Sequence, residues 1–415
     1  MKKICILLIL FCLLPSCATA QWYLFPGKKN PAGATVPDSV SRTKPDSTAV
    51  LQNAADSLAT AADSLGVPEM IPAWKDVFVP ELPDVVHIAL VLPLQASDKP
   101  SDNFLDFYSG ALLALRDLGQ NGLRADLQVF DSADTKASLE PAFGAEQDLL
   151  IGPVSLADIN GALTLLDPRR VLVSPLDPAA APLAENGPVV QSPSPWAAQL
   201  DDLVRWVAQD KLVNEEIYVV RDTAAAGQGE QTDYLMGRLL DSGIRYHSVL
   251  SVKEIPFARN RQFRVMIASD RDSFFASAVR SLSIEGALND DIILYGTSRV
   301  RANGTGPADL HNTNAHLVSP YFIDYEDPAV ADFILAYRAL FQNEPGSFSF
   351  QGYDTMNYFV TMCTKFGRQW YKRLPEYSQK GLQADFRFDH GTERVNVAAR
   401  RVIYHPDLTT SVQRY

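Results

Sequence analysis

The residues of this chain that could do chemistry lie in short polar loops, and the loops are typical of binding sites rather than of catalytic centres. Each loop follows an apolar run that reads as a strand, and the loops are rich in Gly, Pro, Ser and Asp. Binding residues are often carried on loops that a rigid scaffold positions. Where such a loop leads into a helix, free backbone N–H groups and the helix dipole favour an anion. The loops span residues 93–95, 131–132, 153–155, 175–177, 221–222 and 296–298.

Motifs for catalysis and metal binding are weak by comparison. Residues 227–229 form a lone Gly-Gln-Gly fragment without the Gly-Lys-Ser/Thr ending of a phosphate-binding loop. His311 and His316 lie five residues apart with neither an HExxH pattern nor a cysteine partner, so we expect no metal site. Six histidines without a GxSxG motif do not support a Ser-His-Asp triad. We therefore expect no enzymatic activity, no cofactor and no metal.

Length and charge narrow the class of protein further. The 415 residues suit two or three domains, and 47% hydrophobic residues are enough to build cores. A formal net charge of −12 argues against nucleic acid as a partner, because phosphate binding needs a basic surface. It also argues against docking on anionic lipid.

The first twenty residues are typical of an export signal. Lys2 and Lys3 precede an apolar stretch over residues 4–14, which is too short for a membrane span. Residues 14–17 resemble a lipobox, in which Cys17 would be lipidated. Residues 18–20 instead resemble an ordinary cleavage site, and the sequence leaves both ways of processing the signal peptide open. Either one predicts an extracytoplasmic protein, in the periplasm or in the outer membrane as a lipoprotein. A lipid anchor would then be its only membrane attachment. Cys363 would be the one cysteine left besides Cys17, and its apolar neighbours predict a buried helix position.

Residues 21–83 are rich in Pro, Ala, Ser, Thr and Asp and predict a solvated tether. An Asp-Ser pair followed by Val, Thr or Leu recurs in it, and this pattern resembles the O-glycosylation acceptor of some Gram-negative bacteria. A short pattern also arises by chance in such a stretch, and residues 53–65 could instead form a short amphipathic helix. The four copies span residues 38–40, 46–48, 56–58 and 63–65.

From residue 85 onward, apolar runs alternate with amphipathic helical patterns, as in doubly wound parallel sheets. The continuous run over residues 86–92 predicts a central strand buried on both faces. The pattern restarts near residue 216, so we expect two α/β lobes. We assign residues 84–209 and 347–415 to lobe 1 and residues 210–346 to lobe 2. Residues 386–404 predict an antiparallel hairpin turning at His390 and Gly391, with Arg400 and Arg401 on an exposed strand.

The order of these motifs resembles that of the type I periplasmic binding-protein family, which includes the branched-chain amino acid receptors. The resemblance covers residues 85–415, and it extends to outer-membrane lipoproteins of this fold that activate peptidoglycan synthases. It implies two Rossmann-like lobes joined by a hinge, which we expect near residues 209–215 and 343–349, and a C-terminal β-hairpin. The motifs that carry it lie at residues 88–94, 107–111, 131, 151–153, 173–175, 219–222, 227–229, 353–354 and 388–391.

The resemblance also implies a ligand site between the lobes. Ser155 and the loop 174–177 match the positions that hold a ligand carboxylate in the amino acid receptors, although Ser155 could equally cap the helix that follows it. The second lobe departs from the family, since residues 223–226 lack the expected aromatic residue and residues 296–299 lack the expected acid. Asp177 and Asp222 could replace that acid, whereas Arg221, Arg299 and Arg301 could favour an acidic ligand. The predicted ligand-binding residues are Gln95, Phe107, Val154, Ser155, Ser174, Leu176, Asp177, Arg221, Asp222, Thr297, Ser298 and Tyr353.

Two functions remain open on these grounds. The first is an exported solute-binding or sensor module for a small polar ligand, of the amino acid, peptide or muropeptide class. The alternative is a cell-envelope interaction protein that uses the same fold as a scaffold without a small ligand, for example a regulator of peptidoglycan synthesis.

Overall fold

The computed structural model describes residues 82–413, with gaps at 97, 135, 211–215, 259–260, 289–290, 302–304 and 392–393. The expected signal peptide, Cys17, the tether and its Asp-Ser motifs lie outside the described residues. So does most of the hinge expected at 209–215. Within the described ranges, no helix is long and apolar enough to cross a bilayer.

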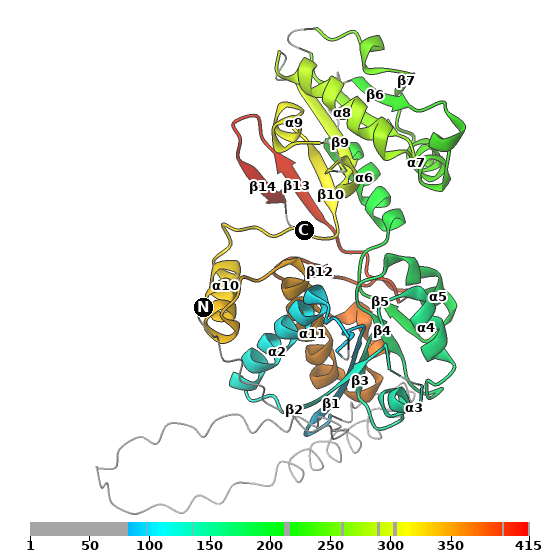
Figure 1. Cartoon of the computed structure of the whole chain (residues 1–415). Helices are drawn as coiled ribbons and strands as arrows, with labels where there is room; N and C mark the ends of the chain where they lie inside the picture. Colours follow the sequence, from blue (N-terminus) through cyan, green and yellow to red (C-terminus); the bar gives the residue numbers. More distant parts are fainter. Residues whose placement is uncertain are drawn as a thin grey trace, which may run out of the picture. The chain divides into compact units, whose positions relative to one another are not determined.

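The first sheet has five parallel strands in the order β2-β1-β3-β4-β5 (Figure 1). Its interior strand β1, between β2 and β3, is buried on both faces, since Ile88 and Leu90 belong to one apolar cluster and Ala89 and Val91 to another. This explains the continuous apolar run. The strands are β1 Val86–Leu92, β2 Ala125–Asp131, β3 Leu149–Ile151, β4 Leu172–Ser174 and β5 Val189–Gln191, and the helices between and after them include α2 Asp102–Gln120, α3 Lys136–Leu139, α4 Leu156–Leu163, α5 Ala181–Asn186 and α11 Ser347–Phe366.

The second sheet has seven strands in the order β14-β13-β10-β9-β8-β6-β7. The strands from β6 to β10 pair in parallel, and β13 pairs antiparallel with both β10 and β14. The strands are β6 Glu216–Arg221, β7 His247–Val249, β8 Phe263–Ala268, β9 Ile292–Thr297, β10 His316–Ser319, β13 Arg400–Tyr404 and β14 Thr410–Gln413, with helices α6 Trp196–Asp210, α7 Glu230–Asp241, α8 Asp272–Gly286 and α9 Pro307–Asn312.

The chain passes between the two sheets three times, through residues 192–195, 320–327 and 387–399. Helix α6 packs on the second sheet, because Leu203 and Trp206 share a cluster with Val219. Helix α10 (Pro328–Phe341) returns to the first sheet's helices, where it packs against α2 and α11. Residues 343–349 therefore join two helices of the same layer, and the hinge expected there was wrong. The division into domains stays a prediction, although strand pairing places residues 400–413 in the second sheet.

A C-terminal hairpin is present, but it is formed by β13 and β14 and turns through residues 405–409. Across the turn expected at His390 there is only an isolated antiparallel bridge between Phe388 and Asn396. The extended hairpin expected there does not form, since Phe386 pairs within the small ladder of β11 Gln379–Lys380 with β12 Asp385–Phe386. Arg400 and Arg401 are 3% and 6% exposed, contrary to expectation, because each forms an ion pair with a carboxylate. Cys363 is buried in α11 with a free thiol, as the sequence predicted.

Candidate functional site

The candidate site consists of the loops that follow the carboxyl ends of the parallel strands, where ligands bind in open α/β sheets. At the end of β4, the Asp177 carboxylate lies on the amino end of the neighbouring helix α4. Its Oδ2 accepts a hydrogen bond from the Leu156 N–H at 3.1 Å, and its Oδ1 accepts one from the Ala179 N–H at 2.9 Å. Asp177 therefore occupies donors that a ligand anion would otherwise use.

Ser155 acts as the N-cap of α4. Its Oγ accepts a hydrogen bond from the Asp158 N–H at 3.1 Å and donates one to the Asp158 carboxylate at 2.7 Å. The capping alternative for Ser155 is thus present in the structure. Its side chain is exposed, so the cap leaves room for a further contact.

The loop that carries Asp177 is held by buried polar groups. Ser174 is fully buried, and its hydroxyl donates to the Asp177 carbonyl at 3.4 Å. Gln191, also fully buried, donates to the same carbonyl at 3.0 Å. Both contacts fix the loop from the sheet side, so they orient Asp177 rather than face a ligand.

A third carboxylate follows β2. Asp131 accepts hydrogen bonds from the Ala96 N–H at 2.8 Å and the Ala133 N–H at 3.1 Å, and so ties the loops after β1 and β2 together. Gln95 lies next to this contact with an exposed side chain and a positive φ of 52°.

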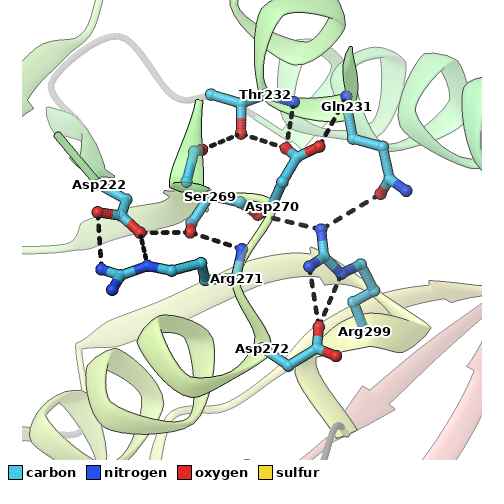
Figure 2. Close-up of polar contacts among 9 residues, drawn as sticks. Asp222, Gln231, Thr232, Ser269, Asp270, Arg271, Asp272 and Arg299 are labelled. Carbon is cyan, nitrogen blue, oxygen red and sulfur yellow. Dashed lines mark hydrogen bonds and ion pairs between the residues drawn. The ribbon is translucent and has the colours of Figure 1, made fainter. Parts of the chain in front are cut away.

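In the second sheet, Asp222 is neutralised by the protein itself (Figure 2). The Arg271 guanidinium donates to both of its oxygens, at 2.7 and 2.9 Å, and the Ser269 hydroxyl donates at 2.8 Å. These contacts, led by the Arg271 hydrogen bonds, lower the pKa of Asp222, which is 2% exposed. Asp222 is therefore not a free acid that could hold a ligand ammonium group.

Asp270 repeats in the second sheet what Asp177 does in the first (Figure 2). Its carboxylate accepts hydrogen bonds from the Thr232 N–H at 2.9 Å and the Gln231 N–H at 3.3 Å, at the amino end of α7. The Thr232 hydroxyl adds a third at 2.6 Å. The amino ends of α4 and α7 thus both carry a carboxylate of the chain.

The three arginines that could favour an acidic ligand differ in their partners. Arg299 donates to the Asp272 carboxylate at 2.8 Å and to the Ser269 carbonyl at 3.0 Å (Figure 2). Arg301 donates to the Ser319 hydroxyl at 3.1 Å. Arg221, at the end of β6, keeps a buried Nε without a hydrogen-bond partner among the described residues. Thr297 and Ser298 lie partly buried where β9 ends.

The other predicted site residues lie in or against the first core. Phe107 is fully buried, and Val154 and Leu176 pack against the same cluster. Tyr353 donates its hydroxyl to Asp117 at 3.0 Å, near the carboxyl end of α2. The loop after β1 leads into the opposite end of α2, so Tyr353 is directed away from it.

Sequence reasoning missed the residues that join the crossovers. Asn396 is 2% exposed, and its side chain donates to the Ser192 carbonyl at 2.8 Å and the Asp385 carbonyl at 2.9 Å. A small recess with a cavity volume of about 10 Å³ lies there. The only sequence signal is the polar Ser-Pro-Ser-Pro loop after β5. The residues that line this recess include Pro175, Ser192, Ser194, Tyr321, Thr355 and Asn396.

A buried carboxylate on α11 holds the turn between β11 and β12. Asp354 accepts hydrogen bonds from the N–H groups of Leu382, Gln383 and Ala384 at 2.7 to 2.9 Å. Burial raises the pKa of Asp354 to about 6 despite these bonds and the nearby Arg400.

No family model matches the sequence, and neither does any curated protein. Solved structures do match. One from Rhodospirillum rubrum, described as a candidate branched-chain amino acid ABC transporter, is 17% identical, covers 79% of this chain and 100% of its own, and has a TM-score of 0.58. An ABC transporter substrate-binding protein from Desulfitobacterium hafniense in complex with Leu is 16% identical, covers 79% and 100%, and has a TM-score of 0.48.

This chain therefore shares its fold with the Rhodospirillum rubrum structure. More particularly, that fold is the type I periplasmic binding-protein fold, with two α/β sheets and a C-terminal hairpin.

Proposed function

We propose that this protein is a non-enzymatic, extracytoplasmic binding or sensor module that holds a small polar ligand at the carboxyl edges of its sheets. Two observations support the proposal. The fold is one whose solved examples include solute-binding proteins, and the strand-end loops are rigidly positioned by buried hydrogen bonds.

We further propose that the ligand is not anchored by a carboxylate at the helix ends. The observation that carries this is the contact of Asp177 with the Leu156 N–H at 3.1 Å, which places a negative charge where a ligand carboxylate would bind. Asp270 does the same on α7. Of the amino acid, peptide and muropeptide class, this favours compounds recognised through hydroxyl, amide or amino groups.

A thermal-shift panel tests this function. A ligand that binds only the folded state stabilises it by RT ln(1 + [L]/Kd). We expect at least one amino sugar, peptide amide or muropeptide to raise the melting temperature, and we expect free leucine to leave it unchanged. If no compound shifts the melting temperature, the binding function is wrong. If leucine shifts it as strongly as leucinamide does, the ligand class is wrong.

A second function, an envelope interaction protein without a small ligand, is favoured by the way the crossovers are tied together. Arg400, which follows the third crossover, donates to the Phe322 carbonyl in the second crossover and to the Gly381 and Leu382 carbonyls between β11 and β12. A module whose connections are fixed in this way suits a scaffold. Capture of a peptidoglycan synthase by the purified protein, with no shift from any small compound, would support this function over the first.

Export, lipidation at Cys17 and glycosylation of the Asp-Ser motifs remain part of the proposal. The intact mass of the protein purified from its native envelope tests all three. We expect loss of the first twenty residues, or cleavage before Cys17 with added lipid. Glycosylation would appear as a further mass increment that is lost when the four motif serines are changed to alanine.

A further inference from the structure

The turn between β11 and β12, residues 381–384, lies between two buried charged side chains that come from different parts of the fold. One is Asp354 on α11, a helix that packs on the first sheet, since Met356 and Phe359 share a cluster with β1. The other is Arg400 on β13, a strand of the second sheet. Asp354 is 2% exposed and Arg400 is 3% exposed.

The peptide groups of this turn are bound on both sides. The Asp354 carboxylate accepts hydrogen bonds from three successive N–H groups at 2.7 to 2.9 Å, those of Leu382, Gln383 and Ala384. The Arg400 guanidinium donates to the Gly381 carbonyl at 2.6 Å and to the Leu382 carbonyl at 2.9 Å. Helix α11 and strand β13 are therefore joined through the same four residues.

Two of the three crossovers are bonded to the same region. In the second crossover, the Phe322 N–H donates to the Gln383 carbonyl at 3.0 Å, and the Phe322 carbonyl accepts from Arg400. In the third crossover, the Asn396 side chain donates to the Asp385 carbonyl at 2.9 Å, directly after the turn. Detachment of the turn would therefore remove a hydrogen bond from the second crossover.

The turn approaches the Asp354 carboxylate so closely that only glycine fits at its first position. A Cβ at Gly381 would lie 2.6 Å from the Asp354 carboxyl carbon and would overlap the Ala384 carbonyl. Gly391 in the third crossover differs, since a Cβ there would meet no described atom within 4 Å. Gly381 is thus required by the contact, and Gly391 is not.

Burial governs the charge of Asp354. It raises the pKa of Asp354 to about 6, although the three N–H groups and Arg400 act in the opposite direction. Burial, with a contribution from the Asp354 charge, also raises the pKa of Tyr321 in the second crossover and of Tyr353 on α11, so both phenols stay neutral in acid. The charged groups nearby have partners of their own, as in the pairs Arg400–Asp385, Lys380–Asp327, Asp106–Tyr337 and Asp117–Tyr353.

We propose that residues 381–384 form a pH-sensitive strap between α11 and β13. A detached turn would return Asp354 to water, where the carboxylate is the more stable form. The attached turn therefore binds a proton more tightly than the detached turn, so acid favours attachment and neutral pH loosens the strap. Because Phe322 donates to the strap, loosening also frees the second crossover. The strap is independent of the ligand proposed for the strand-end loops.

Hydrogen exchange of the full chain, followed at single amides, tests the proposal. After correction for the intrinsic exchange rate at each pH, the amides of residues 382–384 should be about tenfold better protected at pH 5 than at pH 7. This factor follows from a pKa of about 6 in the attached turn and 3.8 in the detached one. The Phe322 amide should change with them. Equal protection of residues 382–384 at the two pH values would overturn the pH sensitivity, and a change that leaves Phe322 unaffected would overturn the coupling.

Two pairs of variants separate the charge from the contact. Asp354→Asn should abolish the pH difference at all four amides, whereas Asp389→Asn, at a carboxylate 73% exposed on the third crossover, should retain it. Gly381→Ala should lower the protection of Phe322 at least about tenfold at both pH values, and Gly391→Ala should leave it unchanged. A pH difference that persists in Asp354→Asn, or equal Phe322 protection in the two glycine variants, would refute the strap.

Discussion

Asp177 lies directly on the amino end of helix α4, with 3.1 Å between its Oδ2 and the backbone nitrogen of Leu156. The residue comes from the loop after β4, whereas the helix follows β3. The contact thus joins two neighbouring strand ends, and it uses a donor that the fold otherwise offers to a ligand. Asp270 and α7 repeat it in the second sheet, so the arrangement belongs to both halves of the protein.

Removing this carboxylate should cost stability and open the helix end to anions. We expect Asp177→Ala to lower the free energy of unfolding by about 1 kcal/mol, as for the loss of a helix cap. We also expect leucine, which should not stabilise the wild-type protein, to raise the melting temperature of this variant. Urea denaturation and thermal shift measure the two effects. Asp332→Ala, an exposed carboxylate on α10, is the control and should show neither.

The ion pair between Asp222 and Arg271 predicts a stability change at acid pH. Because the folded protein lowers the pKa of Asp222, chiefly through Arg271, its contribution is complete above the unfolded pKa and is lost as the pH falls below it. Arg271→Ala should therefore lower the urea midpoint at neutral pH and have a smaller effect at acid pH. An equal loss at both pH values would contradict the role of the charge.

Asp354 should make the free energy of unfolding fall as the pH rises, which is the opposite of the effect of Asp222. Its pKa is about 6 in the folded protein and is near 3.8 when unfolded, so the folded state binds the proton more tightly. Its contribution to stability should fall by roughly 3 kcal/mol in all as the pH rises from below the unfolded pKa to above the folded one, at about 1.4 kcal/mol per pKa unit. Asp354→Asn should remove this slope from urea titrations, and a slope unchanged in the variant would contradict the assignment.

His316 should make the free energy of unfolding rise with pH over the same pH range, and so offset the effect of Asp354. It stacks on Trp206, and burial, aided by Arg264 and His405, lowers its pKa to about 3 from 6.5. The neutral form is favoured in the folded protein, so its contribution is present above pH 6.5 and is lost as the pH falls. His316→Gln should make stability less sensitive to acid. The exposed His247 offers a control, His247→Gln, for which we expect a smaller change.

The buried Arg400 should be among the most sensitive positions for stability. Its guanidinium pairs with Asp385 at 2.7 Å and donates to the carbonyls of Phe322, Gly381 and Leu382. Arg400→Met should destabilise the protein by about 3–5 kcal/mol, because it leaves a carboxylate and several carbonyls without their donor. Chemical denaturation measures this, with Arg338→Met on the exposed face of α10 as the control. A loss below about 1.4 kcal/mol, a tenfold change in the unfolding equilibrium, would show that the crossovers do not depend on Arg400.

The sequence predicted the elements whose burial is uniform. β1 is apolar throughout because both of its faces are covered. The three-residue strand β5 is too short to give a periodic signal, and it was missed. Helix α10, which the sequence grouped with lobe 2, packs against α2 and α11. Local periodicity shows that a helix is amphipathic but not which layer receives its apolar face.

The position of the candidate site was predictable from the sequence, but the hydrogen-bond partners of its polar residues were not. The strand-end loops lie where the alternation of strands and helices implies. What the sequence could not show is which polar residues satisfy one another. Asp222 reads as a free acid until Arg271, 49 residues later, is seen to donate to both of its oxygens. Arg400 and Arg401 read as surface charges from the sequence, because nothing there shows that they pair with Asp385 and Asp202.

A crystal structure of the protein with a compound that raises its melting temperature tests the account most directly. The account predicts electron density for the compound against the strand-end loops, with Asp177 still in contact with the Leu156 N–H and no ligand carboxylate on that donor. Density in which a ligand carboxylate has displaced Asp177, or a compound bound away from these loops, would contradict it.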